Sequence, residues 1–252
     1  MLDQLTRGRL DVGVGRGISP IELSFFNIAA ADSREMFREA LEAVVGAVST
    51  GKLSYAGRYF TYQDIELQIE PYQRPYPPLW YPTNSTESMT WLAREGFHTV
   101  VHYQSMPVIR DLFDLYRRVW EEHQSNRQRL NAHVTDPLYG ISRHVYIGAS
   151  DAAAWEEAKA ALVDFNDNTS YLAARRGDTQ RKNYLNDFEA RRAEGLYIAG
   201  SADSVREQVK QHLEITGSNY FVASFAFGSL THEQAMNSLR LFAQEVMPAL
   251  GR

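Results

Sequence analysis

Two arginines occupy positions at which α/β proteins bind anions. Arg16 stands in the glycine-rich segment 13–17, directly after a valine-rich stretch that predicts a buried strand. Parallel sheets bind their ligands at the carboxyl ends of such strands, although a loop arginine can also lie in solvent or in a salt bridge. Arg34 follows Asp32 in the first turn of a predicted helix, where the helix dipole disfavours a cation by about 0.3 to 1 kcal/mol. The compensating anion is either Asp32 or Glu35, or a bound phosphate shared with Arg16.

A turn rich in hydroxyl groups, residues 82–88, joins a predicted strand to a predicted helix. Its side chains include Asn84, Ser85 and Ser88, and free hydroxyls and backbone amides at a helix start suit a phosphate. Asn84 and Glu87 are also spaced as a capping box, which explains the same residues without a ligand. On the residues alone, both interpretations stay open.

Several other chemistries lack their usual motifs. The segment 13–18 fails as a dinucleotide-binding loop because Ile18 stands where the third glycine should be and no helix starts immediately afterwards. The chain has no cysteine, and its seven histidines form no HExxH, so no metal site is predicted. Neither GxSxG nor GxxxxGK[ST] occurs. Tyr103 ends a predicted strand, where packing in the core is the first interpretation, and the neighbouring His102 is a weak candidate for acid–base work.

Composition and charge narrow the class of protein. With 252 residues, 44% of them hydrophobic and 23% charged, the chain is long enough to fold around a sizeable core. The net charge of -5 offers no basic surface for nucleic acid, and no run of 18 apolar residues predicts a membrane span. No signal peptide is recognised after Met1, so we expect a cytoplasmic protein.

Strands alternate with helices along most of the chain, which predicts an α/β fold with parallel strands. Five main strands and one short strand are predicted, at 9–15, 79–83, 98–103, 138–147, 196–199 and 220–225. The helix that begins at Asp32 or Ser33 ends at Thr50-Gly51 and shows an apolar stripe made of Phe37, Leu41, Val44, Val45 and Val48. Five strands fit either an open sheet or a closed eight-stranded barrel that lacks its first three units.

Three further segments complete the expected organisation. Residues 16–31 are expected to form a loop, and residues 53–69 a small hairpin. Residues 166–194 turn polar, which predicts a surface excursion or a mobile lid within one domain that spans residues 1–252.

Four ordered segments together resemble the bacterial luciferase-like flavin-dependent monooxygenases. They read LDQLTRGRLDVGVGRG, DSREMFREAL, PYPPLWYPTNSTES and FGSLTHEQAMNSLRLFAQEVMPAL, and the match runs from Met1 to Arg252. The resemblance implies a TIM-type (β/α)8 barrel, of which this chain would supply about five βα units, strands 4 to 8. Family members carry about a hundred further residues before the position of Met1, enough for three βα units.

The resemblance also implies a cofactor and roles for particular residues. Reduced FMN is the expected cofactor, with the deazaflavin F420 as the less favoured alternative. Arg16 and Arg34 would hold its phosphate, Asn84, Ser85 and Ser88 would wrap the same group, and Tyr103 would lie near the flavin ring. No catalytic residue is assigned. Gly15 replaces the reactive thiol of the luciferases themselves, which argues against light emission.

The function implied is a monooxygenase that uses reduced flavin and O2 to oxygenate a small organic substrate. A flavin reductase as the source of FMNH2 and a homodimer are the expected partners. The alternative is an inactive or flavin-binding remnant, or a partner subunit of the same family.

Overall fold

The computed structural model describes residues 1–17 and 19–251, so Ile18, at the position that decides against the dinucleotide motif, and Arg252 lie outside the described residues. The chain forms two units, each built from several stretches of sequence. Unit 1 comprises Met1–Pro82, Glu87–Thr99 and Arg117–Pro137. Unit 2 comprises Thr83–Thr86, Val100–Tyr116 and Leu138–Arg252.

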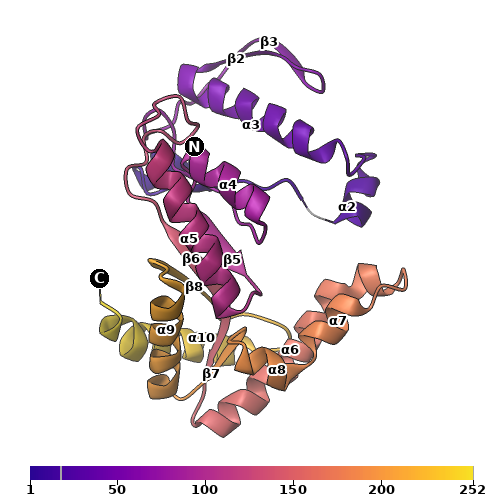
Figure 1. Cartoon of the computed structure of the whole chain (residues 1–252), viewed down its shortest axis with the longest axis vertical. Coiled ribbons are helices and arrows are strands. Elements are labelled where there is room, and N and C mark those ends of the chain that lie inside the picture. The colour runs from indigo at the N-terminus through magenta and orange to yellow at the C-terminus, as the bar shows by residue number, and fades with distance from the viewer. Residues whose placement is uncertain (18, 252) are drawn as a thin grey trace. The chain divides into compact units, whose positions relative to one another are not determined.

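Unit 1 contains a short parallel strand pair and a helix covered by a hairpin. Its elements are α1 (Leu2–Thr6), β1 (Val12–Gly13), α2 (Pro20–Phe25), α3 (Ser33–Thr50), β2 (Lys52–Ala56), β3 (Thr61–Glu66), β4 (Leu79–Trp80) and most of α4 (Thr86–Glu95). β1 pairs with β4 in parallel, with Val12 opposite Leu79. β2 and β3 pair antiparallel and confirm the predicted hairpin, which packs on α3 (Figure 1). Because β1 and β4 are parallel, the segments that follow them leave the pair at the same edge.

α3 begins and ends where the sequence predicted, whereas the segment before α3 differs from the predicted loop. Gly51 ends α3 in the left-handed conformation, with φ 77°, and its amide donates to the carbonyl of Ala47. The expected loop at 16–31 was wrong in part, because residues 20–25 form α2. Ser19 caps this helix by accepting a hydrogen bond from the amide of Glu22, and Pro20 fills its first position.

The core of unit 1 forms around α4 and the strand that follows it. Met89, Leu92, Ala93 and Phe97 are fully buried. Gly96 ends α4 with φ 82° and turns the chain toward β5. These contacts hold α4 against the rest of the unit, so the side chains in its first turns have fixed positions.

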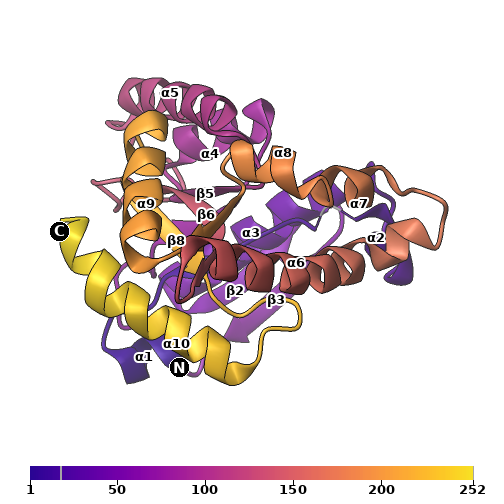
Figure 2. The same ribbon diagram turned by 90° about the horizontal axis from the view of Figure 1, so that it is seen from below.

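Unit 2 is a parallel sheet with helices packed against it. Its elements are β5 (Thr99–His102), α5 (Met106–His123), β6 (Tyr139–Ile147), α6 (Asp151–Ala174), α7 (Gln180–Leu185), α8 (Phe188–Ala193), β7 (Tyr197–Gly200), α9 (Ala202–Thr216), β8 (Tyr220–Ser224), α10 (His232–Leu241), η1 (Phe242–Val246) and η2 (Met247–Ala249). β5 begins, and α5 ends, in unit 1. β6 is the central strand, adjacent to β5 and paired in parallel with both β7 and β8 (Figure 2).

Two apolar clusters fix the helices on this sheet. One packs α6 and α8 on β6 and β7 through residues such as Trp155, Leu162 and Tyr197. The other packs α9 and the end of the chain on β6 and β8 through Val145 and Val209. The predicted alternation of parallel strands and helices is therefore confirmed, although the described residues do not close into a barrel.

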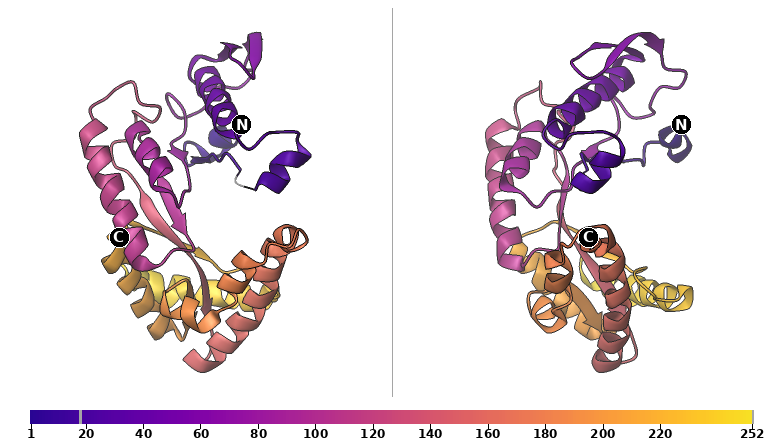
Figure 3. Two further views of the ribbon diagram at one scale, coloured as in Figure 1. Left: turned by 45° about the vertical axis from the view of Figure 1, so that its right-hand side comes forward. Right: turned by 90° about the vertical axis from the view of Figure 1, so that its right-hand side faces the viewer.

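The polar segment 166–194 is helical. α6 continues to Ala174, and α7 then packs back along α6 before α8 leads to β7 (Figure 3). Asn166 is fully buried at this junction, and its amide donates to the carbonyl of Leu185 and to Asn186 Oδ1. Buried polar groups of this kind lock α7 to α6.

Candidate functional site

Arg16 lies at the start of α3. The chain leaves β1 beside β4, with the amide of Val14 donating to the carbonyl of Trp80 at 2.8 Å, and this contact directs Arg16 toward that helix. The Arg16 Nη1 donates to Ser33 Oγ at 2.8 Å, and Ser33 is itself buried and donates to the carbonyl of Ala30. Within the described residues no carboxylate pairs with Arg16. The Arg16 guanidinium is thus held by a neutral hydroxyl.

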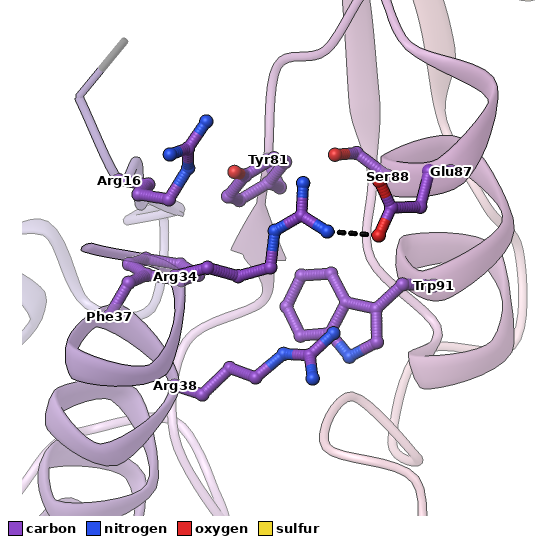
Figure 4. A pocket seen from close by; sticks show the side chains of 8 residues that line it. All are labelled: Arg16, Arg34, Phe37, Arg38, Tyr81, Glu87, Ser88 and Trp91. Carbon is purple, nitrogen blue, oxygen red and sulfur yellow. Dashed lines mark hydrogen bonds and ion pairs between the residues drawn. The ribbon is translucent and has the colours of Figure 1, made fainter. Parts of the chain in front are cut away.

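Arg34 has a carboxylate partner, but neither of the two expected from the sequence. Its Nη1 forms an ion pair with Glu87, in the first turn of α4 (Figure 4). Asp32 instead accepts a hydrogen bond from the Tyr59 hydroxyl at 3.1 Å, and Glu35 pairs with an arginine of the hairpin. Both side chains of the ion pair are well exposed, so the pair contributes little to stability and can be opened by a competing anion.

A pocket of about 30 Å³ in unit 1 brings three guanidinium groups together. The lining residues are Arg16, Arg34, Phe37, Arg38, Tyr81, Glu87, Ser88 and Trp91. Figure 4 shows the three arginines on the side of α3, and Glu87, Ser88 and Trp91 on the side of α4. Three positive groups against one carboxylate leave a formal excess of two positive charges in this pocket.

Aromatic rings form the base of the pocket. Trp91 packs edge-on against two rings. Its ring centroid lies 6.3 Å from that of Phe37 and 5.6 Å from that of Tyr81. The Arg38 guanidinium lies over the Trp91 ring, 5.7 Å from its centroid. The cation–π contact with Trp91 restrains the Arg38 side chain, which lowers the entropic cost of binding an anion there.

The turn at 82–88 divides between the units. Ser88 lines the pocket of unit 1, whereas Asn84 and Ser85 belong to unit 2 and do not appear in that lining within the described part of the chain. Asn84 Oδ1 accepts a hydrogen bond from the His102 amide at 3.1 Å, which ties the start of the turn to the end of β5. The Ser85 amide donates to Thr83 Oγ1.

Tyr103 lies directly after β5 in a left-handed conformation, with φ 47°. A bulky residue in this region is strained, and such strain gathers at functional sites. Its hydroxyl and His144 Nε2 of β6 are hydrogen-bonded at 2.8 Å. Burial raises the pKa of Tyr103 to about 12. Tyr103 is only partly buried, so the expectation of simple core packing gives way to a polar contact between two strands.

His144 is enclosed by aromatic rings. Its ring centroid lies 4.5 Å from that of Phe165 and 4.7 Å from that of Phe227. Burial, and secondly the nearby His102, lowers the pKa of His144 to about 4. Its Nδ1 is buried and has no hydrogen-bond partner among residues 1–17 and 19–251.

Sequence reasoning missed two residues of this arrangement for different reasons. Arg38 lies four positions after Arg34, so helix periodicity would have placed both on one face of α3. Nothing local marks His144, because only strand pairing brings it to Tyr103.

The described residues contain neither a metal-binding cluster nor a membrane-spanning helix. No group of three or more His, Cys, Asp or Glu side chains is arranged to hold a metal ion. No helix within 1–17 and 19–251 has both the length and the apolar character needed to cross a membrane.

Comparison with solved structures places the fold. Monooxygenase RslO1 from Streptomyces bottropensis superimposes with a TM-score of 0.79 at 22% identity, covering 99% of this chain and 71% of that one. The FMN complex of a type II Baeyer–Villiger monooxygenase, the oxygenating constituent of 3,6-diketocamphane monooxygenase from Pseudomonas putida, gives 0.76 at 17% identity, covering 100% and 74%. An F420-dependent secondary alcohol dehydrogenase gives 0.70 at 15% identity, covering 100% and 72%.

Sequence comparison reaches across the whole chain. Uncharacterized protein y4wF of Sinorhizobium fredii is 32% identical over 251 residues, which cover 100% of this chain and 71% of that protein. The alkanal monooxygenase alpha chain of Photobacterium leiognathi is 24% identical, covering 99% and 73%. The family model described as luciferase-like monooxygenase matches residues 1–219. The chain therefore belongs to the luciferase-like monooxygenase family, a family of oxidoreductases.

Proposed function

We propose that this protein is a flavin-dependent monooxygenase that uses reduced FMN and O2 to oxygenate a small organic substrate. The observation that carries the proposal is the pocket of unit 1, where three guanidinium groups face a single carboxylate. A phosphate monoester is a dianion near neutral pH, and its charge matches the excess of two positive charges. Family membership and the printed activities of the relatives supply the reaction class.

The fit of the phosphate follows from the groups present. Arg16 and Arg38 would keep their positions, and Arg34 would exchange the Glu87 carboxylate for a phosphate oxygen. Ser88 would add a hydroxyl. Asn84, Ser85 and Tyr103, which belong to unit 2, are proposed as cofactor-binding residues on the family resemblance alone.

FMN is favoured over F420 because of the charge of the pocket. FMN ends in a phosphate monoester, a dianion near neutral pH, whereas the phosphate of F420 is a diester with a single negative charge that continues into a tail. The excess of two positive charges in the pocket matches the dianion. The fold alone does not choose, since structures with FMN and with F420 both resemble this chain.

The chain's own residues would bind and shield the cofactor. Bound reduced FMN would supply the electrons that activate O2, and the protein would orient it and exclude water. We propose that residues 166–194 act as a lid. Arg181 of α7 is close enough to Tyr103 to lower its pKa against the effect of burial, so this segment reaches the region of β5.

Expectations on the complete fold, the partners and the cellular location also belong to the proposal. The main strands would be strands 4 to 8 of a TIM-type barrel domain spanning residues 1–252. A flavin reductase would supply FMNH2, the protein would form a homodimer, and it would be cytoplasmic.

A titration with two flavins tests the phosphate site. Arg16→Ala should weaken FMN binding by about 1.5 to 3 kcal/mol, about 10- to 150-fold, because it removes a charge-assisted contact. The same change should leave riboflavin, which lacks the phosphate, almost unaffected. Arg58→Ala is the matched control, because this arginine is exposed and pairs with Glu35 outside the pocket. An equal loss for both flavins, or no loss for FMN, would remove Arg16 from the site.

A second variant tests the exchange at Arg34. Glu87→Gln removes the competing carboxylate and should tighten FMN binding by about two- to five-fold, the usual strength of an exposed ion pair. Weaker binding would show that Glu87 supports the site instead of competing for it.

Activity is tested with ¹⁸O2. Reduced FMN, prepared without air, is mixed with the protein, ¹⁸O2 and a panel of ketones, aldehydes and alkanes, and products are analysed by mass spectrometry. One ¹⁸O atom in a product supports the monooxygenase. Tight FMN binding without a labelled product would favour the alternative, a flavin-binding or partner subunit.

The lid is tested by limited proteolysis with trypsin. We expect the first cleavage between Arg175 and Arg192, and slower cleavage when flavin and substrate are bound. A first cut elsewhere would contradict the lid.

A further inference from the structure

The charged side chains of α3 are sorted by sign onto two neighbouring faces. Arg34 and Arg38, four positions apart, line the pocket of unit 1 (Figure 4). Glu35, Glu39 and Glu42 bond instead to the β2–β3 hairpin. Side chains three or four positions apart lie on the same side of a helix, so each set forms a row along α3.

Helix geometry gives Arg38 two carboxylates within reach on its own helix. Glu35 lies three positions before it and Glu42 four positions after it, and ion pairs form on a helix surface at these spacings. Neither pair forms, and within the described residues no carboxylate pairs with Arg38. Arg34 pairs with Glu87 of α4 and, in the described part of the chain, with no acid of α3. Both arginines therefore reach the pocket without a carboxylate from their own helix.

The tip of the hairpin encloses the Glu39 carboxylate. The backbone amides of Arg58, Tyr59 and Phe60 donate to its two oxygens at 2.8, 2.9 and 3.2 Å. A Cβ at the preceding Gly57 would overlap Glu39 Oε2, so glycine at this position permits the close approach. The tip thus docks on α3 by binding a negative charge, and hydrogen bonds to an ionised group are the strong ones.

Side chains of the hairpin bind the other two acids of α3. The Tyr55 hydroxyl donates to Glu42 Oε2 at 3.0 Å. Glu35 Oε2 accepts from Arg58 Nη1 at 3.0 Å and from the Tyr59 hydroxyl at 3.3 Å, so either group still holds it when the other is replaced. The hairpin therefore supplies a partner for every carboxylate of α3, and all of these residues belong to unit 1.

We propose that the β2–β3 hairpin is a positioning element of the phosphate site, which binds the acidic face of α3 and so keeps Arg34 and Arg38 available to an anion. This inference deepens the proposed function and rests on it, since the anion would be the FMN phosphate. Without the hairpin, Glu35 and Glu42 would pair with Arg38 and bring negative charge to the phosphate site. Both effects weaken the binding of a dianion and leave the binding of an uncharged ligand unchanged.

Removal of the hairpin tests this role. Lys52 and Glu66 are cross-strand partners, so the two-residue turn Asn-Gly can replace residues 53–65. In this variant FMN should bind about three- to six-fold more weakly in a fluorescence titration, the combined strength of two or three ion pairs on a helix surface. Riboflavin, which lacks the phosphate, should bind as it does to the wild type.

A rescue experiment separates the electrostatic role of the hairpin from a merely structural one. Glu35→Gln, Glu39→Gln and Glu42→Gln, added together to the protein without the hairpin, should restore FMN binding because they remove the competing carboxylates. Failure of this rescue, an equal loss for riboflavin, or no loss for FMN would each overturn the proposal.

A point variant tests the same role with the hairpin in place, and it decides if the shortened chain does not fold. Tyr55→Phe releases only Glu42 and should weaken FMN binding about twofold, and Glu42→Gln in the same protein should cancel this loss. Tyr62→Phe is the matched control, because Tyr62 is the cross-strand neighbour of Tyr55 and contacts no acid of α3 within the described residues. Unchanged binding in Tyr55→Phe, or a loss that Glu42→Gln does not cancel, would contradict the proposal.

Inorganic phosphate keeps this proposal apart from the flavin proposal. Its binding, followed by ³¹P NMR, should show the same loss without the hairpin and the same rescue. Phosphate binding that depends on the hairpin in a protein without FMN affinity would refute the flavin proposal and leave the role of the hairpin standing. FMN binding that does not depend on the hairpin would refute only the role of the hairpin.

Discussion

His144 makes the stability of the protein depend on pH in a predictable direction. Burial, together with His102, holds its pKa at about 4 in the folded chain, against 6.5 for an unperturbed histidine. The unfolded chain therefore binds more protons between these values, so stability is full above pH 6.5 and falls as pH decreases toward 4. The difference of about 2.5 between the two pKa values corresponds to about 3.5 kcal/mol, from about 1.4 kcal/mol per pKa unit, of which about 3 kcal/mol is lost at pH 4. His144 is almost fully buried, so solvent screening hardly reduces this value.

His144→Gln removes the titrating group and keeps a polar side chain. Free energies of unfolding are measured by urea titration at pH 7, 6, 5 and 4 for wild type and variant. At pH 7 the variant should be less stable by about 1 kcal/mol because its contact with Tyr103 is weaker. At pH 4 the wild type should have lost about 3 kcal/mol more than the variant, and the order of stability should reverse. His98, His133 and His212, whose pKa values are also lowered and which do not act on the pKa of His144, contribute equally to both proteins. Parallel stability curves would refute the argument.

Three structural substitutions have equally definite outcomes. A Cβ at Gly228, where φ is 55°, would overlap the carbonyl oxygen of Ala161, so Gly228→Ala should cost about 3 kcal/mol or more in urea unfolding. Gly177→Ala, also at positive φ but with open space around it, should cost only about 1 kcal/mol, and equal costs would contradict the steric argument. Asn131 is fully buried and bonds to the amide of Leu79 at 3.1 Å and to its carbonyl at 3.2 Å. Asn131→Ala should therefore lower the free energy of unfolding by about 2 to 4 kcal/mol, and a loss below about 1 kcal/mol would show that water replaces the side chain.

Local signals predicted most elements of the fold. The helix predicted after the turn at 82–88 is α4, and hydroxyl residues before it and Gly96 after it mark its two ends. α2 was missed although Ser19 and Pro20 carry the same kind of signal, because six residues are too few to show a helical period.

The buried face of α3 shows the limit of periodicity. The apolar stripe predicted Val44 in the core, yet it is 58% exposed, while Ala43 and Ala47 are buried. Small residues such as alanine allow the backbone of a neighbouring element to approach closely. A pattern of hydrophobic residues does not predict this close approach. The actual face depends on how the β2–β3 hairpin packs on the helix.

In the candidate site, some residues were predicted from local signals and others were not. Arg16, Arg34 and Ser88 were predicted, and the structure brings them to one pocket. The ion pair of Arg34 with Glu87 joins residues 53 positions apart and has no local signal. The contact of Tyr103 with His144 likewise follows from strand order, which a single sequence does not specify.

The two units share elements as well as a chain. The boundaries at 86/87, 99/100 and 116/117 fall inside α4, β5 and α5. Each of these three elements therefore begins in one unit and ends in the other. With 82/83 and 137/138, the polypeptide crosses five times. No single cut can release either unit intact, and an exchange at 86/87, 99/100 or 116/117 would split an element. Separating the two units would require cuts at all five places.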